Sequence, residues 1–171
     1  MYLVSAFVLL HWRPLTLHLA SLDGTIRVWE LGTKSFAETR TIPKYHDDWV
    51  SCRISRSEEY AYTYTQILSV AISPVQKNIA SGGDDGRLFV TDFVTGDVKF
   101  SRDAHKFWIR CVTYSPDGAM IATCSDDSII NVWDADNGSC LLCPFDCDVG
   151  AVLSIAFSPD GKVLASGNAY S

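Results

Sequence analysis

The charge balance of this 171-residue chain argues against a nucleic-acid-binding surface, because 14 Lys and Arg stand against 20 Asp and Glu, a formal net charge of −6. Phosphate backbones are bound by basic stripes, which the sequence lacks. Apolar residues make up 47% of the chain, which is ordinary for a folded domain. The apolar residues 1–10 are too short a run to cross a membrane. We therefore expect neither a nucleic-acid nor a membrane partner.

The N-terminal part predicts a partial sheet. Residues 1–10 lack the basic residue and the small-residue cleavage site of a secretory signal. Residues 17–21 and 25–30 predict two short strands around a turn, and residues 36–42 can form a polar outer strand. The six cysteines show no sign of a disulfide scaffold. We therefore expect an intracellular protein, cytoplasmic or nuclear, in a reducing compartment.

An irregular, tyrosine-rich stretch follows. Residues 46–52 match residues 105–111: each segment begins with His, with Trp three and Cys six positions later. Pro74 follows His46 by 28 residues, however, whereas Pro116 follows His105 by only 11. The excess predicts an insertion at about 53–66, and loops of this length are usually functional or disordered. A binding loop and a tolerated insertion both stay open.

Three Ser-Pro pairs then recur at nearly even spacing. They start at residues 73, 115 and 158, which are 42 and 43 residues apart. Proline presets φ in such a turn, and a following glycine accepts a positive φ. The copy at 103–134 contains alternating strands at 109–114, 119–124 and 129–134. It predicts an antiparallel meander that closes on a Trp-Asp pair.

A period of roughly 40–45 residues with four strands per unit and a closing Trp-Asp is typical of a propeller blade. The chain therefore resembles the WD-repeat (WD40) family over about residues 18–167. The resemblance implies an all-β fold, a β-propeller segment of about three to four incomplete four-stranded blades. The expected repeats are a partial first one at 1–43, a second with the insertion at 44–101, a complete third at 102–143 and a truncated fourth at 144–171.

The same resemblance implies a buried structural network in each blade. It joins a loop histidine, a Ser or Thr of the second strand, an aspartate of the next turn and the closing tryptophan. A buried carboxylate needs such hydrogen-bond donors. Because the network residues recur with the repeat, they do not indicate a catalytic His–Asp pair. We therefore expect this chain to have no enzymatic activity. The network residues are His105, Thr123, Asp127 and Trp133; His46, Ser81 and Asp85, with Thr91 at the tryptophan position; and Asp23 and Trp29.

Members of this family present partners with the rim at one end of the propeller channel. Trp and Arg are common among residues that dominate binding energy. By resemblance the partner-binding positions are Trp49, Ser51 and Asp84 in the second repeat, and Trp108, Arg110 and Asp126 in the third. The first aspartate of each Asp-Asp pair is expected to point to solvent. The alternative for Trp49 and Trp108 is packing between adjacent blades.

The expected function is a non-catalytic protein–protein interaction scaffold that binds a protein or peptide and needs no cofactor. One alternative is a truncated fragment of a larger WD-repeat protein without independent function, whose open blade edges could self-associate. Another is metal binding through Cys140, Cys143 and Cys147. Zinc sites use a second cysteine pair or histidines, which are missing here. Incidental cysteines are therefore the favoured interpretation.

Residues 134–138 begin like a calcium loop, but the spacing then fails and predicts an ordinary turn.

Overall fold

The computed structural model describes residues 9–11, 16–20, 26–31, 36–42, 66–147 and 150–169, all of them strands, turns and loops. Before residue 66 it describes only the path of the backbone. Within these ranges no helix is long and apolar enough to span a membrane. The predicted all-β fold is confirmed.

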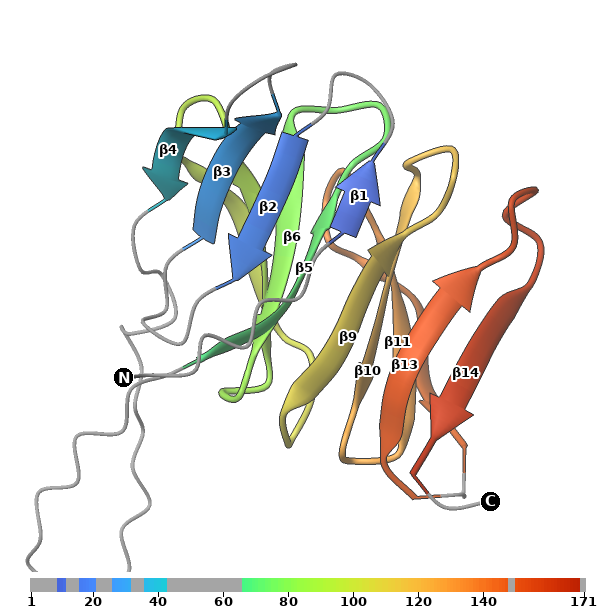
Figure 1. Cartoon of the computed structure of the whole chain (residues 1–171). Helices are drawn as coiled ribbons and strands as arrows, with labels where there is room; N and C mark the ends of the chain where they lie inside the picture. The colour runs from blue at the N-terminus through green and yellow to red at the C-terminus, as the bar shows by residue number, and fades with distance from the viewer. Residues whose placement is uncertain are drawn as a thin grey trace, which may run out of the picture.

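The strands form three antiparallel sheets of four and one of two, each a meander of consecutive strands (Figure 1). The first sheet contains β1 (Leu9–His11), β2 (Thr16–Ala20), β3 (Ile26–Leu31) and β4 (Phe36–Ile42). The second contains β5 (Ile67–Ile72), β6 (Asn78–Gly83), β7 (Arg87–Asp92) and β8 (Val98–Asp103). The third contains β9 (Ile109–Tyr114), β10 (Met120–Ser125), β11 (Ile129–Asp134) and β12 (Cys140–Asp146). The fourth contains β13 (Val152–Phe157) and β14 (Leu164–Asn168).

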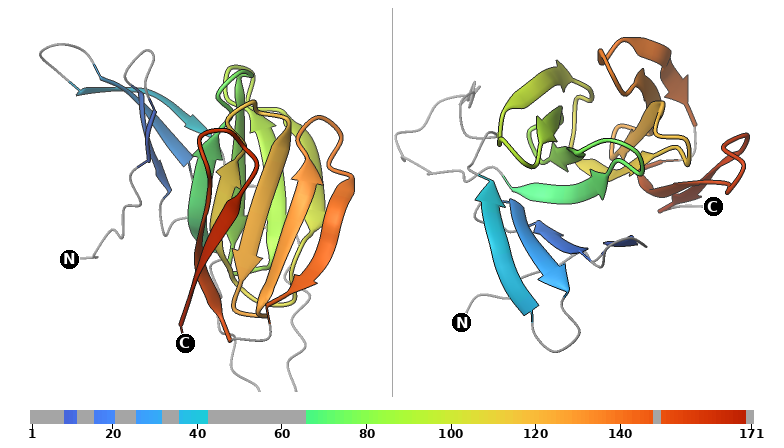
Figure 2. Two further views of the ribbon diagram at one scale, coloured as in Figure 1. Left: turned by 90° about the vertical axis from the view of Figure 1, so that its right-hand side faces the viewer. Right: turned by 90° about the horizontal axis from the view of Figure 1, so that it is seen from above.

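Successive sheets are arranged like blades. β5 contacts β9, β9 contacts β13, and the first sheet reaches the second through β2 and β5. Seen from above, the second and third sheets fan outward, with β5 and β9 innermost and β8 and β12 outermost (Figure 2). This is the architecture of incomplete propeller blades, as the repeat spacing predicted.

The outer strands run slightly past the expected repeat boundaries. β8 ends at Asp103 and β12 at Asp146, whereas the sequence placed boundaries after residues 101 and 143. The reason is that the last residue of each outer strand pairs with the first residue of the third strand of its sheet. Asp103 of β8 pairs with Arg87 of β7, and Asp146 of β12 pairs with Ile129 of β11.

Two separate apolar cores hold the second, third and fourth sheets together. From Cys111 onward, side chains of β9 alternate between the two faces of the third sheet, as the two-residue period of a strand requires. Val112 and Tyr114 pack toward the second sheet, and Cys111 packs toward the fourth. The third sheet is therefore covered on both faces, which is why its central strands β10 and β11 are almost entirely buried.

Candidate functional site

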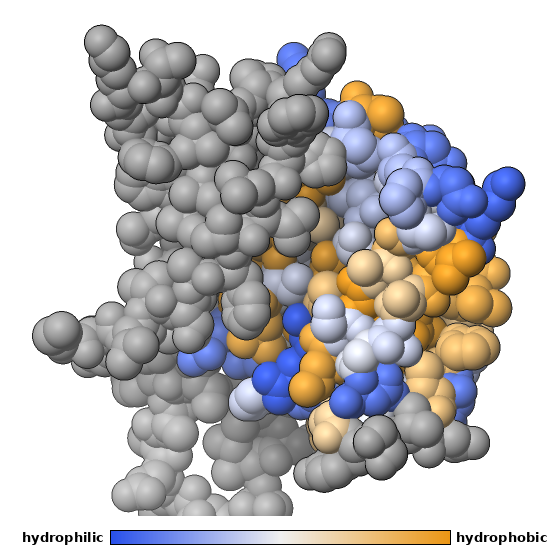
Figure 3. Space-filling model, turned by 45° about the vertical axis from the view of Figure 1, so that its right-hand side comes forward, coloured by the Kyte–Doolittle hydropathy of each residue, from blue (hydrophilic) through white to orange (hydrophobic). Residues whose placement is uncertain are grey.

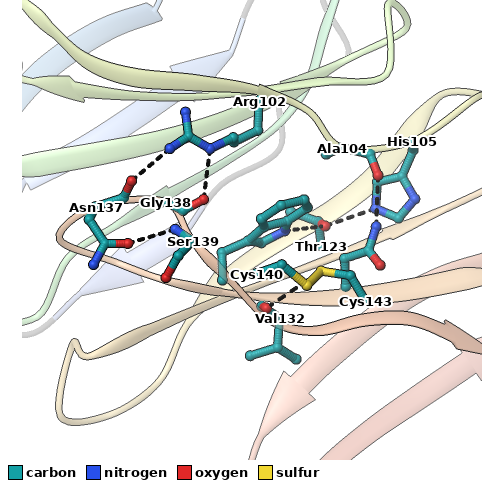
Figure 4. Close-up of a disulfide and its surroundings, with 12 residues drawn as sticks. Arg102, Ala104, His105, Thr123, Val132, Asn137, Gly138, Ser139, Cys140 and Cys143 are labelled. Carbon is teal, nitrogen blue, oxygen red and sulfur yellow. Dashed lines mark hydrogen bonds between the residues drawn. A yellow bond between two sulfur atoms is a disulfide. The ribbon is translucent and has the colours of Figure 1, made fainter.

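Four side chains of the third sheet form one hydrogen-bonded set, part of which Figure 4 shows beside β12. His105 follows β8, Thr123 lies in β10, Asp127 in the next turn and Trp133 in β11. The Nδ1 atom of His105 is 3.1 Å from each carboxylate oxygen of Asp127, and its Nε2 is 2.8 Å from the Thr123 hydroxyl. The indole N–H of Trp133 donates to the same hydroxyl at 3.0 Å. The set thus ties the loop after β8 to β10, to the following turn and to β11.

The hydrogen bonds of this set form a chain in which each group donates to the next, from Trp133 to Asp127. Because an indole N–H can only donate, the Thr123 oxygen accepts from Trp133 and donates its own proton to Nε2 of His105. The Nδ1–H of His105 then donates to Asp127. Burial lowers the pKa of His105, and the opposing attraction of Asp127 does not overcome it. The imidazole is therefore neutral near neutral pH.

The Asp127 carboxylate is buried but well supplied with donors. Its side chain is 5% exposed, and that of His105 is fully buried. The backbone N–H groups of Lys106 and Ile129 donate to it, each at 3.0 Å. The Thr–His–Asp order is that of a hydrolytic triad. Thr123 is completely buried, however, and its oxygen already has two partners, so the set has the geometry of a structural anchor.

The second sheet carries part of the same set. Ser81 is buried in β6, and Asp85 accepts the backbone N–H of Arg87 at 2.9 Å. Thr91 is buried in β7 at the place that Trp133 takes in β11. Three other expected members cannot be placed: His46 and Asp23 lie outside the residues that the structure describes, and so does the side chain of Trp29.

Three of the expected partner-binding residues meet where β9 begins and β10 ends; we call them the third-sheet rim. Arg110 donates two parallel hydrogen bonds to Asp126, from Nε to Oδ1 and from Nη2 to Oδ2, both 2.7 Å long. Its guanidinium carbon lies 4.9 Å from the centre of the Trp108 ring. The Trp108 side chain is held in place by this stacking but remains 47% exposed.

The rim corrects one expectation. Trp108 is 47% exposed and stacks on Arg110 of its own sheet, so the alternative of packing between blades is not needed to place it. Asp126 does not simply point to solvent, since Arg110 binds it and only 26% of its side chain is exposed. In the second sheet, Asp84 likewise accepts the backbone N–H of Gln66 at 3.0 Å. In both sheets, the first aspartate of the Asp-Asp pair accepts a hydrogen bond from a residue near the start of the innermost strand. Trp49 and Ser51 lie outside the described ranges.

Phe107, which was not among the expected partner-binding residues, adds exposed apolar surface beside the rim in sequence. Phe107 is 60% exposed and directly precedes Trp108. Two adjacent aromatic residues in an otherwise polar connection were a usable signal. Because Asp126 neutralises Arg110, the rim offers aromatic surface beside an ion pair, a combination suited to protein contacts.

The C-terminal cysteines also differ from expectation. Cys140 and Cys143 form a disulfide within β12, although the sequence favoured incidental cysteines (Figure 4). Register shifts between β11 and β12 make this outer strand irregular, which brings positions three apart together. Two of the three sulfurs proposed as metal ligands are thus bonded to each other, and Cys147 is a free thiol. No group of three His, Cys, Asp or Glu in the described ranges could hold a metal ion.

A hollow of about 330 Å³ lies at the opposite end of β9 from the rim, between the ends of β5, β9 and β13. Apolar and hydroxyl-bearing side chains line it, including Ile72, Tyr114 and Phe157. None of the lining residues is an acid or a base that would act near neutral pH. Burial raises the pKa of the Tyr114 phenol further, which removes it from such a role.

Comparison with known proteins identifies the repeats as WD repeats. The family model described as "WD domain, G-beta repeat" matches residues 58–92, 96–134 and 138–171. The chain is 27% identical to human WD repeat-containing protein 43 over 157 residues, covering 86% of this chain and 23% of that protein. It is 27% identical to rat apoptotic protease-activating factor 1 over 158 residues, covering 88% and 11%. It is 33% identical to Schistosoma mansoni WD repeat-containing protein SL1-17 over 147 residues, covering 86% and 42%. The chain therefore spans less than half the length of each of these relatives.

Proposed function

The chain belongs to the WD40-repeat family, and we propose that it binds a protein or peptide partner through the third-sheet rim. Members of this family are in general protein-interaction scaffolds without enzymatic activity. The proposal extends this general role to particular residues and to an intracellular protein partner. The net charge of −6 supports a partner other than nucleic acid.

The geometry of the rim is the observation that carries the proposal. Phe107 and Trp108 are consecutive residues with exposed aromatic side chains, and Arg110 stacks on the Trp108 ring. A side chain that is already fixed in the free protein loses little conformational entropy when a partner covers it. Aromatic and Arg side chains in such positions often contribute most of the binding energy.

Replacing Trp108 with alanine should weaken partner binding by at least about tenfold, because the exposed ring is the largest preorganised apolar contact of the rim. Proteins retained from a lysate by the immobilised chain would be identified by mass spectrometry, and their affinities measured by calorimetry. Arg110→Ala should weaken the same partners, since it frees both Trp108 and Asp126. Val94→Ala is the matched control, because Val94 is also about half exposed, at 45%, but lies between β7 and β8. Equal retention by Trp108→Ala and the control would contradict the proposal.

A second candidate role, self-association, is favoured by the fourth sheet. This sheet has two strands in the described part of the chain, β13 and β14. Apolar residues gather on the face formed by the C-terminal sheets (Figure 3). In the fourth sheet, Leu153 of β13 is 46% exposed, and Val163, directly before β14, is 61% exposed.

If this face joins two chains, light scattering should give the mass of a dimer, and Leu153→Glu should restore the mass of one chain. A charge at a buried apolar contact is strongly unfavourable, which is why one substitution suffices. Val94→Glu, which places the same charge on a comparably exposed position, should leave the dimer intact. A single-chain mass for the unmodified protein at every concentration rules out this role. Large, undefined aggregates would support the alternative of a fragment without independent function.

A further inference from the structure

Three free cysteines lie together outside the rim and the buried network. Cys111 is in β9, Cys124 in β10, and Cys147 follows β12; all three pack in the core between the third and fourth sheets. Cys111 and Cys124 are direct partners in the register of β9 and β10. Directly opposite residues in an antiparallel pair project from the same face with their Cα atoms about 4.5–5.5 Å apart. That spacing lies inside the range that a disulfide bridges, roughly 4.4–6.8 Å.

We propose that Cys111 and Cys124 are a redox modification site, at which a hydroperoxide converts the two thiols into a cross-strand disulfide. Taken singly, each of these cysteines would be a small apolar residue of a strand. It is their facing positions that make them a pair. A bulge between Cys124 and Ser125 adds to the local twist, which gives the two sulfurs room to approach.

The surroundings give the two thiols different roles. The neighbouring Cys124 thiol chiefly lowers the pKa of Cys111, with smaller contributions from the backbone of Ile155 and from Ser69. The nearby Cys111 sulfur, together with burial, raises the pKa of Cys124. Cys111 is therefore the more acidic of the two thiols and the one that ionises first. The thiolate is the form that attacks an oxidant.

Accessibility follows the same order. Cys111 is partly exposed, whereas Cys124 is completely buried. A small hydroperoxide therefore reaches Cys111 first, and Cys124 is in place to react with the product. Cys147 is also partly exposed, but burial and the nearby Asp146 raise the pKa of its thiol, which disfavours its thiolate.

The reaction balances in two steps. The Cys111 thiolate attacks one oxygen of hydrogen peroxide, the O–O bond breaks, and a sulfenic acid and hydroxide form. Cys124 then attacks the sulfenic sulfur: an S–S bond forms, the S–O bond breaks, and the hydroxyl group leaves as water with a proton. In total two thiols are oxidised to one disulfide, and one hydrogen peroxide is reduced to two waters. A dithiol reductant reverses the change by thiol–disulfide exchange.

The test is peptide mapping of the purified chain after reduction and exposure to one equivalent of hydrogen peroxide at neutral pH. Free thiols are then alkylated, and trypsin with chymotrypsin cuts after Arg110, Tyr114 and Trp133. These cuts place Cys111 in peptide 111–114 and Cys124 in peptide 115–133, apart from all other cysteines. The expected product is these two peptides joined by a disulfide, with the loss of alkylation at Cys111 and Cys124 and its full recovery after dithiothreitol.

Cysteine variants distinguish oxidation of the Cys111–Cys124 pair from unspecific oxidation of thiols. Cys147→Ser should form the joined peptides as the unmodified chain does, and Cys111→Ser should form none. Cys124→Ser should leave a sulfenic acid at Cys111, which dimedone traps. This readout also works if the buried substitution lowers stability. Joined peptides that include Cys147 in place of Cys124, or a Cys111 no more reactive than glutathione in the same solution, would overturn the proposal.

Discussion

Replacing Asp127 with alanine is expected to lower the free energy of unfolding by about 2–3 kcal/mol. Its carboxylate accepts from the imidazole of His105 and from the backbone N–H groups of Lys106 and Ile129. Alanine leaves these donors without an acceptor in a site where the His105 side chain is fully buried. An unmade hydrogen bond costs most when water cannot replace it. Urea unfolding followed by tryptophan fluorescence measures the difference.

Asp97→Ala is the matched control for this change. Asp97 is an exposed aspartate in the turn between β7 and β8, so its removal should change stability by less than about 0.5 kcal/mol. Asp127→Asn should fall between the two, because the amide oxygen still accepts hydrogen bonds but carries no charge. Equal losses for Asp127→Ala and Asp97→Ala would mean that the buried set does not anchor the sheet.

The fold of residues 66–169 was largely predictable because local chemistry repeats there. Alternating residues, a Ser-Pro turn and a closing Trp-Asp gave the bounds of β9 and β11 to the residue. In the turn itself, Ser115 donates to Asp117 at 2.6 Å, which fixes the chain reversal. Such contacts join residues that are near in sequence, so a sequence pattern can encode them.

Contacts that depend on register were not predictable. Arg110 and Asp126 were both expected at the rim, but their ion pair depends on the bulge at the end of β10. The Cys140–Cys143 disulfide depends on the irregular pairing of β12. A regular strand would separate side chains three apart onto opposite faces. Alternation fixes the face of each side chain, whereas a bulge changes the face and must be seen in three dimensions.

Replacing Gly86 with serine is expected to cost about 3 kcal/mol or more, because both the backbone angle and the available space require glycine. Gly86 has φ of +73°, and an added Cβ would lie 2.3 Å from the carbonyl oxygen of His105. The Gly86 carbonyl also accepts the N–H groups of Ala104 and His105, at 3.0 and 2.9 Å. The substitution would therefore push away the loop that delivers His105 to the buried set. Urea unfolding measures the loss, and NMR titration of His105 reports the displaced ring.

Ser128 is the internal control for Gly86, since it occupies the equivalent turn of the third sheet. It already adopts a positive φ of 68° with a side chain. A left-handed conformation costs a non-glycine residue roughly 1–2 kcal/mol, so Ser128→Gly should leave stability unchanged or raise it. The two substitutions exchange the same residues at matched positions, and only Gly86→Ser should lower stability. A Gly86→Ser chain as stable as the unmodified one would show that the loop before β9 is not seated on this turn, and that His105 is held by its side-chain partners alone.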